Sequence, residues 1–232
     1  MHEVFFIVKS FISRNKSLYT AYYHLYIRHK YKRLPWFSKE TQIYYDGYPR
    51  SGNTFLDYIF RNVFKKIKST HHFHKIAPIK IAFDKQIPVF ILIRKPFDAI
   101  TSYYLKYYSK KESGLPEKVN IKLLDQLTTD YIRYYEFVIK KKDELNIIQF
   151  DDLISNPYEI IYKIGKSIDQ EYEEDDIKSA LLTFKGTTDK LGSSKPNAYK
   201  QKKKLDLTEY LNETKNYSKA IKIYEKIIQL HN

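Results

Sequence analysis

The sequence of 232 residues contains no cysteine. This absence excludes disulfide bonds, thiolate zinc sites and cysteine nucleophiles, and it suits a reducing compartment. Long apolar runs are missing too: the most apolar stretch near the start, residues 4–12, is too short to span a bilayer and is interrupted by Lys9. The opening segment Met1–Glu3 lacks the basic character of a secretory signal. We therefore expect a cytoplasmic protein without a transmembrane segment. An amphipathic helix followed by the basic run 28–33 could contact the surface of a membrane.

Internal repeats and low-complexity linkers are also absent, so we expect one domain over residues 1–232. The 41 basic against 27 acidic side chains give a formal net charge of +14, which attracts anions. Nucleic acid, anionic lipid, anionic glycan and phosphorylated cofactors all fit that charge. Abundant Lys, Ile, Asn and Tyr is also what an AT-rich genome produces, so the charge alone does not select a partner.

Hydrophobic periodicity predicts alternating strands and helices. Strands are expected at 41–47, 88–93 and 146–150, and helices at 53–66, from Pro96 onward, and at 121–143, 157–168 and 217–228. The run 88–93 is apolar throughout, as in a parallel strand buried on both faces. The pattern predicts a three-layer α/β/α fold with a central parallel sheet.

The segment Gly47–Thr54 lies between the first strand and its helix, where such folds bind phosphate with backbone N–H groups and the helix dipole. Gly52 permits a close backbone approach, and Arg50 adds a permanent cation suited to phosphate or sulfate. The segment differs from a Walker A loop because Asn53 replaces the lysine. The next apolar strand ends in Arg94 where a magnesium-binding nucleotide enzyme needs a carboxylate. Both differences favour a metal-free phosphate site.

At Tyr48–Leu56 the chain resembles the PAPS-dependent sulfotransferases, which use 3′-phosphoadenosine 5′-phosphosulfate as donor and whose loop usually reads Tyr-Pro-Lys-Ser-Gly-Thr-Thr-Trp-Leu. The family's second motif, an Arg ending a strand and a Ser eight positions later, is matched by Arg94 and Ser102. A third similarity is 150–153 (Phe-Asp-Asp-Leu) followed by Pro157. The resemblance covers residues 41–170, leaving 1–40 as an N-terminal extension and 171–232 as a C-terminal helical part.

The resemblance implies sulfuryl transfer from PAPS to an acceptor hydroxyl, with PAP released and no metal required. Arg94 and Ser102 would bind the 3′-phosphate of the donor. Arg50 replaces the commoner lysine and would stabilise the leaving phosphate by hydrogen bonding, since arginine does not donate its proton. The residues implied to hold the 5′-phosphosulfate are Arg50, Ser51, Gly52, Asn53, Thr54 and Phe55.

A histidine is the natural base for taking the acceptor proton, because its pKa lies near neutrality. The family places one about 22 residues before the 3′-phosphate arginine, often after a threonine. His71 follows Thr70, whereas His72 has the 22-residue spacing to Arg94, so both stay candidates. If a strand continued through His74, at most two of the three histidines in this segment could converge, so we do not expect a metal site.

The C-terminal region and the acceptor are less readable. Among basic, Gly-containing segments that could close over the 3′-phosphate, we select Lys195 as the candidate. Tyrosines at 103, 104, 107 and 108 are either core or the lining of an acceptor cleft, and a glycan or another alcohol fits as acceptor. Two alternatives remain: a P-loop nucleotide kinase-like enzyme, and a non-catalytic basic protein that binds anionic glycan or nucleic acid. No nucleic-acid-binding motif is recognisable, so nucleic acid is not the expected partner.

Overall fold

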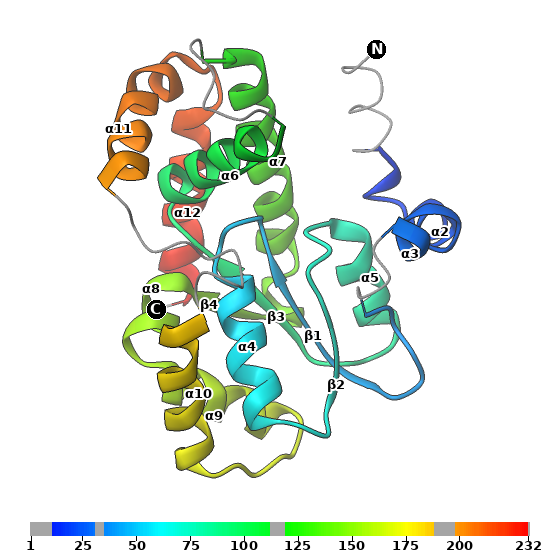
Figure 1. Ribbon diagram of the computed structural model, residues 1–232. Helices are drawn as coiled ribbons and strands as arrows, with labels where there is room; N and C mark the ends of the chain where they lie inside the picture. Colours follow the sequence, from blue (N-terminus) through cyan, green and yellow to red (C-terminus); the bar gives the residue numbers. More distant parts are fainter. Residues whose placement is uncertain (1–10, 31–34, 112–118, 188–197, 232) are drawn as a thin grey trace.

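Four parallel strands form the central sheet in the order β2-β1-β3-β4. The computed structural model describes residues 11–30, 35–111, 119–187 and 198–231. The strands are β1 (Thr41–Gly47), β2 (Lys68–His71), β3 (Val89–Ile93) and β4 (Asn146–Gln149) (Figure 1). All five residues of β3 are buried, as expected for a strand covered on both faces.

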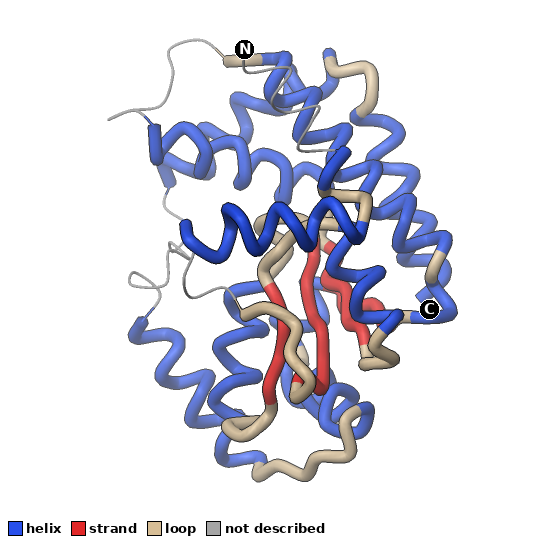
Figure 2. The backbone as a smooth tube through the Cα atoms, turned by 90° about the vertical axis from the view of Figure 1, so that its right-hand side faces the viewer, coloured by secondary structure: helices blue, strands red, loops and turns tan. Residues whose placement is uncertain are grey.

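Helices cover both faces of the sheet because strand side chains alternate between two apolar clusters. Ile43 and Leu92 belong to the cluster on one face, and Tyr44 and Ile91 to the cluster on the other. The first face packs on α4 (Asn53–Val63), α8 (Phe150–Ser155), α9 (Pro157–Ser167) and α10 (Glu174–Thr187). The second packs on α5 (Ile76–Asp84), α6 (Pro96–Lys111), α7 (Ile121–Lys140), α11 (Ala198–Glu213) and α12 (Tyr217–His231). Helices therefore lie on both sides of the strands (Figure 2). The expected three-layer α/β/α fold is confirmed.

The N-terminal segment comprises α2 (Lys16–Tyr22), a π-helical turn (Tyr23–Ile27) and the short α3 (Arg28–Lys30). It joins the core through aromatic packing: the Tyr23 ring stacks on Trp36 with centroids 4.0 Å apart, and Phe73 lies edge-on to both rings. In the part of the chain that the structure describes, no helix combines the length and apolarity needed to cross a membrane.

The elements whose ranges were predicted differ from those observed mainly at their ends, whereas α5, α10, α11 and β2 had no predicted range. The helix expected at 53–66 ends at Val63, and the helix expected at 121–143 ends at Lys140, before a 3-10 turn at Lys142–Glu144. Phe150, expected to end a strand, instead begins α8. The four-residue edge strand β2 is too short and too polar to produce a periodic signal.

Gly47 pairs with Leu92 across β1 and β3, and this close packing provides a test of the fold. A Cβ there would lie 2.5 Å from the backbone oxygen of Leu92. We expect Gly47→Ala to lower the free energy of unfolding by about 1–3 kcal/mol, because neither strand can move without disturbing the sheet. Urea denaturation measures the loss, with the exposed Glu171→Ala as control. Equal stability of the two variants would contradict this packing constraint.

Candidate active site

The candidate site lies at the carboxyl ends of the parallel strands. Along the chain, the connection from β1 leads outward to β2, and the connection from β2 leads back across β1 to β3. The carboxyl ends of β1 and β3 therefore flank a topological switch point, which is where open α/β sheets bind ligands. The loop 48–52 follows β1 at this point, and Arg94 follows β3.

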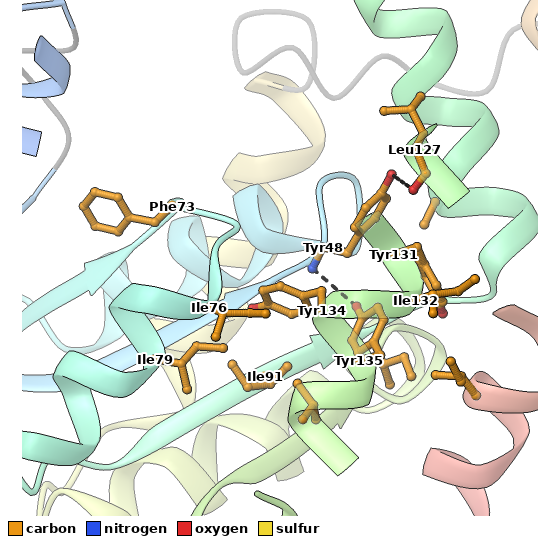
Figure 3. Packing of buried hydrophobic residues seen from close by; sticks show 14 of the residues in the cluster. Tyr48, Phe73, Ile76, Ile79, Ile91, Leu127, Tyr131, Ile132, Tyr134 and Tyr135 are labelled. Carbon is orange, nitrogen blue, oxygen red and sulfur yellow. Dashed lines mark hydrogen bonds between the residues drawn. The ribbon is translucent and has the colours of Figure 1, made fainter. Parts of the chain in front are cut away.

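Hydrogen bonds connect the loop to residues of α7 (Figure 3). Tyr48 donates its hydroxyl to the Leu127 carbonyl at 3.0 Å, and its N–H donates to the Tyr135 hydroxyl at 3.3 Å. The Tyr135 hydroxyl in turn donates to the Leu92 carbonyl at 2.7 Å and lies 3.3 Å from the Ser51 hydroxyl. These buried hydrogen bonds fix the loop to β3, so its conformation is set before any ligand arrives.

The loop backbone has a conformation that exposes N–H groups. Gly52 has φ +101°, and a Cβ there would lie 2.8 Å from the Phe150 ring, so glycine is needed for both reasons. Arg50 also has a positive φ, of 72°. Within the described residues, no acceptor is found for the N–H groups of Gly52, Asn53 and Thr54 at the start of α4. Three unpaired donors and the helix dipole favour an anion here.

Two guanidinium groups stand beside these donors. Arg94 donates from Nη1 to the Arg50 carbonyl at 3.1 Å, and its guanidinium lies over the Phe150 ring at 4.0 Å from the centroid. Arg50 donates from Nε to the Ser102 hydroxyl at 3.0 Å. The two segments implied by the sequence, the loop and the pair Arg94–Ser102, are therefore in direct contact although they lie more than 40 residues apart.

The two arginines form a partly buried cationic site, and no carboxylate among the described residues bonds to either guanidinium. Burial lowers the pKa of Arg50, and the nearby charge of Arg94 lowers it further. Burial also lowers the pKa of Arg94, with Asp98 and Asp151 opposing the shift. The Nε atom of Arg94 is buried and has no acceptor among the described residues. An anion bound between the loop and Arg94 would compensate the two buried charges, reduce their mutual repulsion and give the Arg94 guanidinium an acceptor.

The buried carboxylate of Asp46 places the histidine segment next to the loop. It accepts hydrogen bonds from the N–H groups of Gly47, Phe73 and His74 at 2.9, 2.8 and 2.6 Å, and from the Tyr44 hydroxyl at 2.9 Å. Burial alone would raise the pKa of Asp46, but the charge and hydrogen bonds of His74, together with the charge of His72, lower it to about 2. The carboxylate thereby ties the end of β1 to the turn after β2.

Strand β2 ends at His71, so the assumption of a strand through His74 is wrong. His72 and His74 have φ values of 65° and 56°, because the backbone turns to direct successive N–H groups at Asp46. The Nδ1 atoms of His71 and His72 face one another within hydrogen-bonding distance. The Nε2 atom of His72 lies 3.5 Å from the Thr54 hydroxyl, and thus at the phosphate loop. His74 instead contacts the Gly47 carbonyl at 2.7 Å.

Asp57, His71 and His72 each bring one potential metal-ligand atom within 4.8 Å of the others. The Asp57 carboxylate is already engaged, since it accepts hydrogen bonds from Arg61 on both oxygens and from the Tyr45 hydroxyl at 2.8 Å. A divalent cation would have to lie beside the Arg61 guanidinium or displace it. These groups fit a hydrogen-bonded chain better than a metal site.

Other expected residues have mixed outcomes. Phe55 lies on α4 with its ring edge-on to Phe184 of α10, with centroids 4.8 Å apart, a contact not foreseen from the sequence. Tyr104 is a core residue, whereas Tyr103 is partly exposed and edge-on to Tyr48. Lys195 lies outside the described residues, as do the side chains of the tyrosines at 107 and 108.

Four residues of the candidate site were not predicted from the sequence, because only tertiary contacts bring them to it: Asp46, Asp57, Tyr135 and Phe150.

The buried His71 makes folding stability depend on pH. Burial lowers its pKa from 6.5 to about 4, although Asp57 opposes the shift. Between these two values His71 binds a proton in the unfolded chain but not in the folded chain, so its contribution lowers the free energy of unfolding as the pH falls. We expect a shallower fall in His71→Gln, measured by urea denaturation from about pH 7 to about pH 4. Identical slopes for the variant and the unmodified chain would exclude this contribution.

No protein-family model matches the chain, and no curated protein matches it. Among solved structures, a mouse sulfotransferase, SULT7A1, complexed with PAP aligns with a TM-score of 0.49 and 11% identity. The alignment covers 83% of this chain and 90% of that one. A likeness at this level has no weight for function, so the functional argument depends on the sequence motifs and the geometry of the site.

Proposed function

We propose that this chain is a PAPS-dependent sulfotransferase that transfers the sulfuryl group to an acceptor hydroxyl and releases PAP. The main support is the contact between the loop and the Arg94–Ser102 pair, through Arg50 Nε to Ser102 at 3.0 Å and Arg94 to the Arg50 carbonyl at 3.1 Å. Two motifs that together resemble a donor site for a nucleotide with two phosphate groups thus form one cationic surface.

The residues fit the donor by their chemistry. The free N–H groups of Gly52, Asn53 and Thr54 would bind the 5′-phosphosulfate, with Ser51 fixing the loop beneath them. Arg94, through its guanidinium, and Ser102, through its hydroxyl, would hold the 3′-phosphate. Phe55 supplies an aromatic surface at the helix start. We still predict that Lys195 belongs to a basic segment that closes over the 3′-phosphate.

When bound, PAPS supplies a sulfuryl group on a phosphate leaving group: the bond from sulfur to the phosphate oxygen breaks, and a bond from sulfur to the acceptor oxygen forms. The leaving oxygen keeps the electron pair of the broken bond, and Arg50 with the loop N–H groups would stabilise its charge. The acceptor proton passes to a base, for which His71 and His72 are the candidates. The acceptor fits a glycan or another alcohol, with the partly exposed Tyr103 near the loop.

The kinase-like alternative is less well supported by these residues. Strand β3 is followed by Arg94, not by a carboxylate that could hold magnesium. The carboxylate nearest the start of the loop, Asp46, is fully buried and already accepts four hydrogen bonds. A non-catalytic basic protein would use its surface charge and would not depend on the partly buried Arg94.

Calorimetric titration with PAP, and separately with ATP and magnesium, tests the donor site without knowledge of the acceptor. We expect metal-independent PAP binding that weakens at least about tenfold in Arg94→Ala, because a charge-assisted bond contributes about 1.5–3 kcal/mol. Ser102→Ala should weaken binding less, since a neutral hydroxyl is lost. The control Lys163→Ala removes an equal charge on α9, where that lysine is exposed and paired with Glu159. Preference for ATP with magnesium, or equal effects of Arg94→Ala and Lys163→Ala, would overturn the proposal.

Arg50 provides a second test, because its cation is expected to act during transfer. Arg50→Met keeps the side-chain length but removes the charge, whereas Arg50→Lys keeps the charge. We expect PAP release from PAPS to fall at least about tenfold in Arg50→Met and to be largely retained in Arg50→Lys. Release is followed chromatographically with water or a simple phenol as acceptor. Equal losses in both variants would show that the charge of Arg50 is not what matters.

A further inference from the structure

A continuous chain of polar contacts runs from Asp57 through His71 and His72 to Thr54. The carboxylate of Asp57 lies 3.1 Å from Nε2 of His71, the Nδ1 atoms of the two histidines are in contact, and Nε2 of His72 is 3.5 Å from the Thr54 hydroxyl. Because α4 provides both Asp57 and Thr54, the two ends of this chain are fixed to one helix.

The protonation of the first member sets that of the next. Burial raises the pKa of Asp57, but hydrogen bonds from Arg61 and Tyr45 and the nearby His71 lower it below its usual value overall. Asp57 is therefore a carboxylate, which can only accept. The atom of His71 beside it, Nε2, is favoured as the protonated nitrogen. Since burial keeps His71 neutral near pH 7, its Nδ1 atom bears a lone pair.

That lone pair determines the tautomer of His72. Two unprotonated nitrogens in contact would repel one another, so Nδ1 of His72 must carry the hydrogen that His71 accepts. A neutral His72 then has its lone pair on Nε2, the atom that faces Thr54 and the loop. Burial lowers the pKa of His72, and the charges of His74 and Arg61 lower it further. Asp46 and Asp57 oppose this shift.

His71 itself is poorly placed to meet an acceptor. Its side chain is 6% exposed, it stacks on Tyr45 with the rings nearly parallel, and both of its nitrogens are occupied. His72 is more exposed and has the strained φ of 65°, which the turn at Asp46 imposes and which directs its ring toward the loop. Strain at such a position is typical of functional residues.

We propose that His72 is the base and that Asp57 and His71 are positioning residues that hold its Nε2 unprotonated toward the phosphate loop. This inference rests on the proposed function. In the reaction, Nε2 of His72 takes the acceptor proton as the new sulfur–oxygen bond forms. The charge then on His72 is stabilised through its Nδ1–H bond to His71, whose Nε2 lies 3.1 Å from the Asp57 carboxylate.

Nitrogen NMR of the unmodified protein, labelled with ¹⁵N-histidine, tests the tautomers directly at neutral pH. Protonated and unprotonated ring nitrogens have well-separated ¹⁵N chemical shifts. The variants His71→Asn and His72→Asn assign the signals to the two histidines. We expect the Nε2–H form for His71 and the Nδ1–H form for His72. An Nε2–H tautomer or an imidazolium at His72 would overturn the inference, whatever the activity of the variants.

A matched pair of variants tests the positioning role. In His71→Asn the amide oxygen can occupy the place of Nδ1 and accept from His72, whereas His71→Gln reaches toward Asp57 and leaves that place empty. We expect PAP release from PAPS to fall about tenfold or more in His71→Gln and to be largely rescued in His71→Asn. PAP affinity should be unchanged in both. Equal losses in the two variants would contradict a role through the Nδ1 acceptor.

The readouts separate this inference from the proposed function. If PAP does not bind, the sulfotransferase assignment fails, and His72 loses its role as a base even where the tautomers are as expected. If PAP binds tightly and His72→Gln releases PAP as fast as the unmodified chain, the donor site stands and the base assignment fails. Tight PAP binding, the expected tautomers and rescue by asparagine together support it.

Discussion

The site depends on one buried carboxylate. Asp46 is fully buried at the end of β1. Its charge is compensated by the backbone N–H groups of Gly47, Phe73 and His74 and by the side chain of His74. An uncompensated charge at this depth would be very costly, so the turn after β2 must bring its N–H groups to this carboxylate. The positions of the loop and of the histidine segment are therefore coupled. A change in either one would leave buried polar groups unpaired.

A second constraint is the accumulation of positive charge at the same edge. Arg94 donates to the Arg50 carbonyl and lies over the Phe150 ring, and Arg50 donates to the Ser102 hydroxyl. None of these contacts neutralises the two positive charges. The unpaired N–H groups at the start of α4 add to this field. Such an arrangement is unfavourable for the empty chain but favourable for binding a polyanion, because desolvation has already occurred. Under the proposed function, this arrangement would let the site bind phosphate and sulfate groups without a metal.

The abundance of tyrosine has a structural explanation in this region. Tyr48, Tyr131 and Tyr135 fill the space between the loop and α7, and two of their hydroxyls bond to backbone carbonyls of β3 and of the residue after it (Figure 3). A tyrosine combines a large apolar ring with one polar end, so it can pack in the core and still satisfy a buried carbonyl. These tyrosines therefore support the loop from within the core.

The sequence by itself determined the local features. It located the strand–loop–helix at 41–63, the buried strand before Arg94 and the helix from Pro96, because hydrophobic period, glycine and proline act over a few residues. It also paired Arg94 with Ser102 through the resemblance. Only the tertiary structure decided which groups meet: that Arg50 reaches Ser102, that Asp46 holds the histidine turn and that Asp57 lies behind His71. These contacts join residues on different elements, and their partners are set by sheet order and buried charge compensation, which no local pattern encodes.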